Sequence, residues 1–269
     1  MENKIGASSR KMSRKFNVSH TTILRNLKKI QMKYRKRTKV PKHSAKQIED
    51  IPKKCRLLRR KFLKKETVLV MDDEKYFTFS CLNLTGKSGF YTKNIRDTPA
   101  DIKFMRKTKF EPKILVWAAI SEKGVSELFI ETSKGFALKK ETYIKQCLTR
   151  LKKFLQKYHA GDRILFWPDL ASCHYARETL DWLKNNKIEF VPRDANPPNL
   201  PAARPIENFW ALLAREVYKN GWEAKTKQQL VNRIIYCSKK VSVETVQKMM
   251  RSVRTKLRAI EDMGPDALY

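Results

Sequence analysis

Residues 68–79 read VLVMDDEKYFTF. The apolar run VLVM predicts a buried strand that ends in acids, and the aromatic alternation of YFTFSC, residues 76–81, predicts a second strand. Two other segments also place an acid at the edge of an apolar stretch: ILFWPDLASCHYA, residues 164–176, and RPIENFWALL, residues 204–213. The acids of interest are Asp73, Asp169 and Glu207.

These three acids predict a metal centre. If the strands ending at Asp73 and Asp169 are neighbours in one sheet, their carboxylates meet at one edge, and a helix that starts near Glu207 can pack across it. Clustered carboxylates repel unless a cation lies between them, and Mg²⁺ or Mn²⁺ suits such ligands. Two ions about 3.5–4 Å apart would support attack on a phosphodiester. Taken singly, each acid is more often a turn residue or a complement to a helix dipole.

The charge of the chain indicates a polyanionic partner. It has 59 Lys and Arg against 27 Asp and Glu, a net charge of +32. Residues 1–65 hold 23 of these cations and 3 acids, which gives +20 in the first quarter. We expect a nucleic acid or another anionic surface as the partner. A solvated basic tail has the same composition.

Cysteine usage and hydropathy exclude other classes of protein. The five cysteines form no CxxC pair, which argues against a zinc ribbon or a redox motif. The longest apolar run, residues 114–120, is too short to span a bilayer. We therefore expect a protein without a membrane partner, located in the nucleus.

The first 32 residues have the pattern of a helix-turn-helix segment. Met12 and Phe16 lie four apart on a short helix, Ser19 is a suitable N-cap, and a second helix follows from His20 to about Lys29. The inward face of the second helix is expected to consist of Ile23, Leu27 and Ile30. Any amphipathic helical pair would show the same periodicity, but the basic charge favours DNA binding.

The predicted DNA contacts come from the outer face of the second helix and from the basic connector that follows. They are Thr21, Thr22, Arg25, Asn26, Lys28, Lys29, Arg35, Lys36 and Arg37. The connector could equally be a nuclear-localisation signal or a solvated stretch. We assign residues 33–65 to a basic linker and a helix from about Pro52 to Lys65.

Residues 66–269 read as an α/β domain. Its elements follow the order β-β-β-β-α-β-α-β-α, with a helical C-terminal part, which predicts a mixed sheet flanked by helices. Trp117, Trp167 and Trp210 are expected in the core. His174, close to Asp169, is expected to support the local loop rather than to act as a base, and Arg204 is a candidate phosphate contact.

Three motifs resemble those of the Tc/mariner superfamily of DNA transposases. Asp73 is followed by Glu74; D-x-A-x-x-H spans Asp169 to His174; and P-I-E-x-x-W spans Pro205 to Trp210. The second and third acids have 37 residues between them. The phrase ILVWAAIS, residues 114–121, is similar to the third-strand phrase of the family.

The resemblance implies a ribonuclease H-like core in which Asp73, Asp169 and Glu207 hold two Mg²⁺ or Mn²⁺ ions. It implies double-stranded DNA as the partner and a cut-and-paste transposase that cleaves DNA at terminal inverted repeats and transfers strands into target DNA, acting as a homodimer on DNA. Two departures stand out. Leu170 replaces a common Asn, and the one helix-turn-helix resembles the second of two family units, so the first is expected to be missing.

Two other functions remain open at this stage. The chain could be a catalytically inactive or host-adopted transposase-derived DNA-binding protein, which retention of all three acids disfavours. It could also be a basic structural or RNA-associated protein, but that function does not account for the three acidic motifs.

Overall fold

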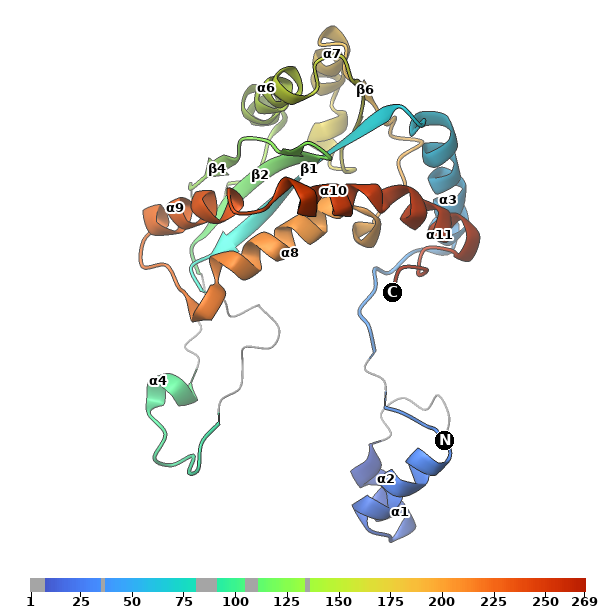
Figure 1. The fold of residues 1–269 in the computed structure, drawn as a ribbon, viewed down its shortest axis with the longest axis vertical. Coiled ribbons are helices and arrows are strands. Elements are labelled where there is room, and N and C mark those ends of the chain that lie inside the picture. The colour runs from blue at the N-terminus through green and yellow to red at the C-terminus, as the bar shows by residue number, and fades with distance from the viewer. Residues whose placement is uncertain (1–7, 35–36, 81–90, 105–110, 134–135) are drawn as a thin grey trace. The chain divides into compact units, whose positions relative to one another are not determined.

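The computed structural model describes residues 8–34, 37–80, 91–104, 111–133 and 136–269 (Figure 1). The chain divides into two compact units, residues 1–40 and 41–269, called here the N-terminal unit and the core unit. Arg35 and Lys36, two of the predicted DNA contacts, lie outside the described residues. Within the described ranges, every helix is too short or too polar to cross a bilayer.

The N-terminal unit is a pair of helices, α1 (Ser9–Phe16) and α2 (His20–Lys29). The Ser19 hydroxyl accepts a hydrogen bond from the backbone N–H of Thr22, which confirms the predicted N-cap. Ile23 is buried as expected, but Ile30 is 64% exposed. The expectation for Ile30 was wrong because α2 ends at Lys29 and the chain turns at Gln31, which has a φ of 56°.

The core unit contains a mixed sheet, as the sequence predicted. Its strand order is β3-β2-β1-β5-β6, and β4 pairs with β2. Strands β1 and β2 are antiparallel, whereas β1, β5 and β6 are parallel. The strands are β1 (Thr67–Thr78), β2 (Lys113–Ser121), β3 (Gly124–Val125), β4 (Phe129–Glu131), β5 (Arg163–Trp167) and β6 (Glu189–Phe190).

Strand β1 corrects the prediction of two separate strands in residues 68–81. It runs unbroken for 12 residues, and its acidic stretch stays in register with β2, where Asp73 lies opposite Ala118. The stretch contains no glycine, proline or asparagine that would favour a turn, so the acids stay within the ladder. Cys81, the last residue of the predicted second strand, lies outside the described residues.

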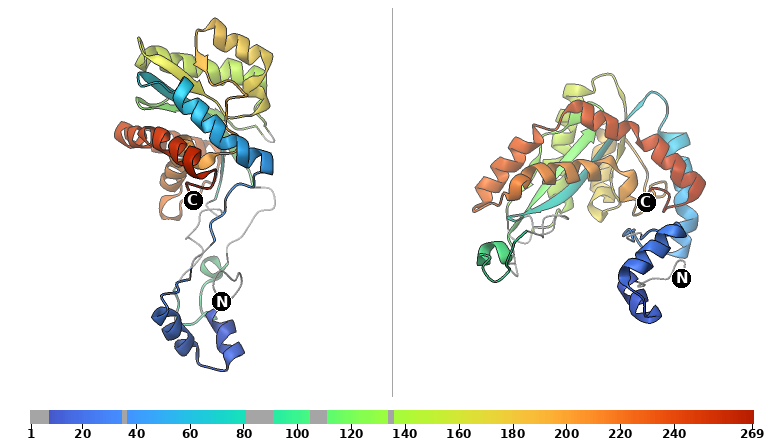
Figure 2. Two further views of the ribbon diagram at one scale, coloured as in Figure 1. Left: turned by 90° about the vertical axis from the view of Figure 1, so that its right-hand side faces the viewer. Right: turned by 60° about the horizontal axis from the view of Figure 1, so that its bottom comes forward.

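Helices cover both faces of this sheet (Figure 2). The face around Val70 and Trp117 packs against the π-helical η2 (Tyr143–Leu148), α6 (Thr149–Tyr158) and α7 (Arg177–Asn185), and the short α5 (Lys140–Thr142) leads into η2. The face around Met71 and Ala118 packs against α3 (Ala45–Leu57), α8 (Pro205–Val217), α9 (Lys227–Ser238), α10 (Val243–Arg251) and α11 (Val253–Met263). The three predicted core tryptophans are buried, each with at most 1% of its surface exposed.

Helix α3 (Ala45–Leu57) starts earlier than predicted. The Ser44 hydroxyl accepts from the Gln47 N–H, and the Gln47 side chain accepts from the Ser44 N–H, so a capping box fixes the start. Pro52, which we had expected at the first turn, lies inside the helix. A π-helical segment, η1 (Leu58–Phe62), continues α3, and both belong to the core unit.

The remaining described elements are short. They are α4 (Ala100–Lys103), between β1 and β2, and the 3₁₀ segments η3 (Ser172–Tyr175), η4 (Pro201–Ala203) and η5 (Lys219–Gly221). Segment η3 follows Asp169, and η4 immediately precedes the helix that carries Glu207. Both therefore shape the edge of the sheet at which the acids lie.

Candidate metal centre

Strands β1 and β5 bring two predicted acids to one edge of the sheet. Their parallel pairing ends at Met71 and Trp167, and Asp73 and Asp169 each follow two residues later. The two carboxylates therefore lie side by side where the parallel pairing ends, Asp169 beyond the end of β5 and Asp73 still paired with β2. The condition set from sequence, that these strands be neighbours, is confirmed.

Asp73, Glu74 and Asp169 form the acidic cluster. Each offers a carboxylate oxygen, and these oxygens all lie within 4.8 Å of one another. All three residues are partly buried. Carboxylates so close together in low-dielectric surroundings repel one another, and a divalent cation bound between them would remove that repulsion.

Asp73 is held by a side chain of α8. Its Oδ2 accepts a hydrogen bond from Trp210 Nε1 at 3.0 Å. Burial raises the pKa of Asp73 to about 7, and the charges of Glu207 and Glu74 add to this, while Arg204 acts in the opposite direction. Burial and the two neighbouring acids thus outweigh the effect of Arg204 on the pKa of Asp73.

Asp169 has a positive partner in His174. Its Oδ1 lies 2.5 Å from His174 Nδ1 and accepts a hydrogen bond from the Ala171 N–H at 2.9 Å. Burial would raise the pKa of Asp169, but the contact with His174 outweighs it and lowers the pKa to about 2. Asp169 is therefore ionised and ready to bind a cation at neutral pH.

His174 lies between two acids of the cluster. Its Nε2 is 3.4 Å from Glu74 Oε1, and its ring lies against that of Tyr143 with centroids 4.3 Å apart. Burial opposes protonation, but the close contacts with Asp169, Cys173 and Glu74 raise the pKa of His174 well above its ordinary value. With 1% of its surface exposed, His174 orients Asp169 and Glu74 and does not face a substrate.

Glu74 was not predicted as a ligand. Side chains alternate along a strand, so a residue next to Asp73 is expected to point to the opposite face of the sheet. Here β5 has already ended, and Glu74 reaches Asp169 from that other face. In the motif that resembles the transposase family, Glu74 is only the residue that follows Asp73. No spacing in the sequence marks it as a ligand.

Asp72, the other acid of the pair, is on the opposite face of β1 from Asp73 and is not one of the three acids of the cluster. It is fully buried, and its Oδ2 accepts hydrogen bonds from Trp117 Nε1 at 3.0 Å and from the Tyr143 hydroxyl at 2.6 Å. Burial raises the pKa of Asp72 to about 6. Of the two adjacent aspartates, Asp73 is thus the one at the metal centre and Asp72 is part of the core.

Arg204 is a structural clamp and not the phosphate contact suggested by the sequence. Its Nη2 donates to the Asp72 carbonyl at 2.8 Å, and its Nη1 donates to the carbonyls of Trp167 and Pro168 at 3.3 and 3.2 Å. The side chain is buried. Arg204 therefore ties the end of β5 to the acidic part of β1 and sets the separation of the two carboxylates.

Glu207 lies in the first turn of α8 and is exposed. It is near enough for its charge to raise the pKa of Asp73, but it is not one of the three acids whose oxygens lie within 4.8 Å. The structure thus brings Asp73 and Asp169 together and leaves Glu207 at the periphery of the cluster.

The acidic cluster fits a divalent cation by its chemistry. The donors are carboxylate oxygens, which Mg²⁺ and Mn²⁺ prefer. Glu74 Oε1 is buried and receives no hydrogen bond of good geometry. A buried acceptor without a hydrogen bond lowers the stability of the folded state. A cation bound beside Asp73 and Asp169 would give this oxygen a partner.

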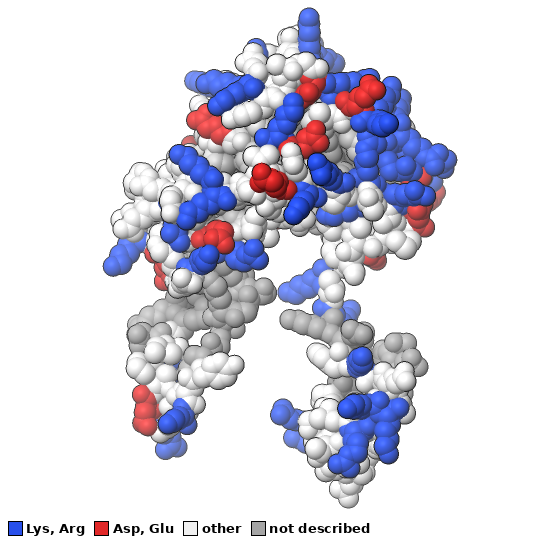
Figure 3. All heavy atoms as spheres, viewed as in Figure 1, with Lys and Arg blue, Asp and Glu red and all other residues white. Residues whose placement is uncertain are grey.

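The predicted DNA contacts of the N-terminal unit lie on its surface. Thr22 is half-buried because its hydroxyl lies 2.7 Å from that of Ser19. The other described members are exposed: Thr21, Arg25, Asn26, Lys28, Lys29 and Arg37. Figure 3 shows Lys and Arg side chains gathered on this unit.

A mixed sheet with helices on both faces, and with acids where the parallel pairing of two adjacent strands ends, is a ribonuclease H-like fold. Solved structures of the Mos1 transposase share it. The Mos1 paired-end complex with the left transposon end matches at a TM-score of 0.79 and 17% identity, covering 98% of this chain and 76% of that one. The catalytic domain of the Mos1 mariner transposase matches at a TM-score of 0.60 and 16% sequence identity. That match covers 86% of this chain and 99% of the Mos1 domain.

The sequence is similar to that of the Tc3 transposase of Caenorhabditis elegans. The two sequences are 29% identical over 191 residues, which is 70% of this chain and 54% of the relative. The match thus spans about half the length of that curated relative. No protein-family profile matches the sequence.

Proposed function

We propose that this chain catalyses metal-dependent cleavage of DNA at terminal inverted repeats and transfers the freed strand into target DNA, as a cut-and-paste transposase does. The observation that carries the proposal is the convergence of Asp73, Glu74 and Asp169 within 4.8 Å in a fold shared with Mos1 transposase. The relatives support it, since they include a Tc3 transposase and a Mos1 strand transfer complex.

The acidic cluster would hold a divalent ion, which supplies charge stabilisation and an activated oxygen nucleophile at a phosphodiester. The residues of the chain prepare that chemistry. His174 keeps Asp169 ionised and oriented, Trp210 fixes the rotamer of Asp73, and Arg204 sets the spacing of the two strand ends. Mos1 structures with Mn and with Mg support the choice of ion.

We further propose that Glu207 completes the ligand set and that two ions are bound. Its location in the first turn of α8, with its charge felt at Asp73, supports this assignment. The proposed DNA partners are transposon ends and target DNA, read in part by α2. A homodimer on DNA is supported by the paired-end complexes of Mos1.

The test is strand cleavage with purified full chain. A random duplex pool selected by the protein supplies the recognised sequence, and nicking of that duplex is followed with and without Mn²⁺ or Mg²⁺. We expect wild-type nicking only with metal and its loss in Asp169→Asn. The control Asp181→Asn makes the same change on exposed α7, where the side chain is 54% exposed, and should leave nicking intact.

Two results would contradict the proposal. Equal nicking by wild type and Asp169→Asn would show that the acidic cluster is not the active site. DNA binding by wild type without nicking in either metal would favour the catalytically inactive, transposase-derived DNA-binding protein.

A further inference from the structure

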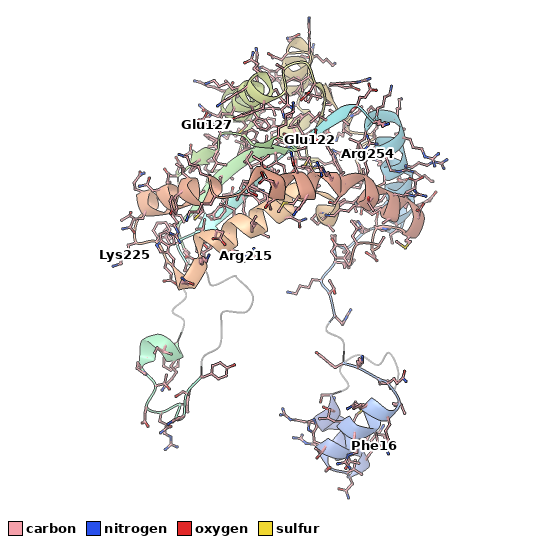
Figure 4. All side chains as sticks on the ribbon, viewed as in Figure 1. Phe16, Glu122, Glu127, Arg215, Lys225 and Arg254 are labelled. Atoms are coloured by element: carbon pink, nitrogen blue, oxygen red, sulfur yellow. The ribbon has the colours of Figure 1, made fainter. Side chains whose placement is uncertain are left out.

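A dense group of cations covers α3 and the adjoining part of α11. Residues 45–65 hold nine Lys and Arg and two acids. Figure 3 shows this density over α3, and Figures 1 and 4 show α11, with Arg254 labelled, beside it. We call the exposed part of this surface the basic ridge and define it as Lys53, Arg56, Arg60, Arg254 and Arg258.

The ridge presents cations along one side of α3 and of η1, which continues it and carries Arg60. Lys53, Arg56 and Arg60 have side chains 66%, 60% and 57% exposed. They are three or four residues apart and so lie on one helical face, over about 10 Å of axis. Duplex DNA carries about one charge per 1.7 Å, so this stripe can face several phosphates at once.

Glu261 of α11 organises the arginines. Its carboxylate pairs with Arg59 at 2.5 Å and lies 3.5 Å from Arg60 and 3.7 Å from Arg56. One carboxylate cannot neutralise three guanidinium groups. Arg59 is largely buried and takes the close, two-nitrogen contact, which leaves the exposed Arg56 and Arg60 oriented but incompletely paired.

The other acids on this surface do not cancel the excess. Glu49 pairs with Lys53 at 2.5 Å, and Asp262 lies 3.6 Å from Arg258; both acids are more than half exposed. Asp50 is half-buried on α3. Exposed pairs of this kind are weak and yield to a stronger anion.

The ridge is rigid because the other side of α3 packs into the core of the core unit. Ile51, Cys55 and Leu58 have no exposed surface, and Arg254 of α11 donates to the Lys64 carbonyl. A docked helix cannot bury an apolar face in a lipid headgroup layer. Cations fixed on a docked helix therefore suit a stiff polyanion, such as duplex DNA, better than they suit a lipid surface.

The ridge shares its support with the acidic cluster. On the inner side of α3, Lys54 Nζ donates to the Asn196 carbonyl at 3.4 Å, and Asn196 Nδ2 donates to the carbonyl of Pro168 at 2.9 Å. Pro168 immediately precedes Asp169. The helix that carries the ridge is thus anchored to the loop that presents a catalytic acid.

We propose that the basic ridge is a second DNA-binding surface, on the core unit and distinct from α2, which holds the phosphate backbone of a duplex without reading its sequence. The proposal rests on the proposed function only in taking DNA as the substrate. The ridge would hold a length of duplex against the same rigid support as the acidic cluster.

The test is the salt dependence of DNA binding by the full chain, without divalent metal so that cleavage plays no part. The ridge variant is Arg56→Gln with Arg60→Gln. The matched control is Lys152→Gln with Lys153→Gln, two exposed cations on α6 across the sheet. A reference variant, Lys28→Gln with Lys29→Gln, removes two cations of α2.

We expect the slope of log affinity against log salt to become shallower by about 2 in the ridge variant, for both the selected duplex and a scrambled one. The α6 control should keep the wild-type slope. A ridge variant with the wild-type slope, or an equal change in the α6 control, overturns the proposal. If the double variant fails to fold, Arg60→Gln alone should change the slope by about 1.

A membrane would give a different result. Binding to vesicles containing phosphatidylserine is measured for the same proteins. Loss of vesicle binding in the ridge variant, with duplex binding unchanged, overturns the proposal in favour of a lipid surface. Since none of these measurements uses catalysis, failure of the ridge and failure of the nicking assay are separate outcomes.

Discussion

Trp210 Nε1 donates a hydrogen bond to Asp73 Oδ2 at 3.0 Å, which joins the third sequence motif to the first. The two residues are 137 positions apart. The tryptophan of P-I-E-x-x-W therefore does more than fill the core. It fixes the orientation of the Asp73 carboxylate, which belongs to the acidic cluster.

We predict that Trp210→Phe weakens divalent-metal binding by about 10- to 100-fold, the usual effect of removing a hydrogen bond to a ligand. Phenylalanine keeps most of the packing but cannot donate to Asp73. The measurement is titration with Mn²⁺. Trp117→Phe is the control, since it removes the matching bond to Asp72; it should cost stability while metal affinity remains.

We predict that Asp73→Asn stabilises the metal-free protein at about pH 8, by about 1–3 kcal/mol. Burial raises the pKa of Asp73 to about 7, so the folded state resists ionisation of this group and stability falls as pH rises toward 7. A neutral side chain removes that cost. The measurement is urea unfolding of wild type and variant.

The same variant should lose stabilisation by metal. Wild type at about 100 times the dissociation constant of Mn²⁺ should gain about 2.7 kcal/mol, while Asp73→Asn should gain much less. An equal gain in both proteins would place the bound ion elsewhere.

Arg204→Met should lower the free energy of unfolding by about 2–4 kcal/mol, because the buried carbonyls of Asp72, Trp167 and Pro168 lose the guanidinium donor and, among the described residues, only that of Pro168 keeps a side-chain donor, the Asn196 amide. Arg215→Met on the same helix is the control. Figure 4 labels Arg215 on α8, where it is exposed, and its loss should change stability by at most about 0.5 kcal/mol. Chemical unfolding of both variants checks this, and equal effects would contradict the clamp.

His159 should make stability depend on pH away from the acidic cluster. Its Nε2 lies 2.8 Å from Ser121 Oγ and its Nδ1 lies 2.8 Å from Asp162. Burial lowers its pKa below 6.5, although Asp162 opposes this. The unfolded state therefore takes up a proton first, and the stability contributed by His159 is lost as pH falls below about 6.5.

The check is urea unfolding at about pH 7.5 and about pH 5.5. His159→Gln should lose less stability than wild type between the two, and the difference isolates His159 from the buried aspartates. His43→Gln serves as the control for loss of an imidazole. A slope unchanged by His159→Gln would contradict the linkage.

Much of the local structure could be predicted because its causes are local. Ser19 caps α2 through the backbone N–H of Thr22, three residues away. The apolar runs at residues 68–71 and 164–167 form adjacent buried strands. The continuous β1 could not be predicted, because cross-strand pairing with β2 carries it past the acids. The early start of α3 had a local signal, the capping box of Ser44 and Gln47, which our prediction missed.

The sequence by itself determined which acids matter as candidates, since each one is set in its own local phrase at a strand or helix end. Only the tertiary structure decided that Asp73 and not Asp72 faces the cluster, that Glu74 joins it, and that Arg204 supports the site from within. The reason is physical. A carboxylate's role depends on the charges and donors brought near it from distant parts of the chain, and that proximity exists only after β1, β5 and α8 have packed together.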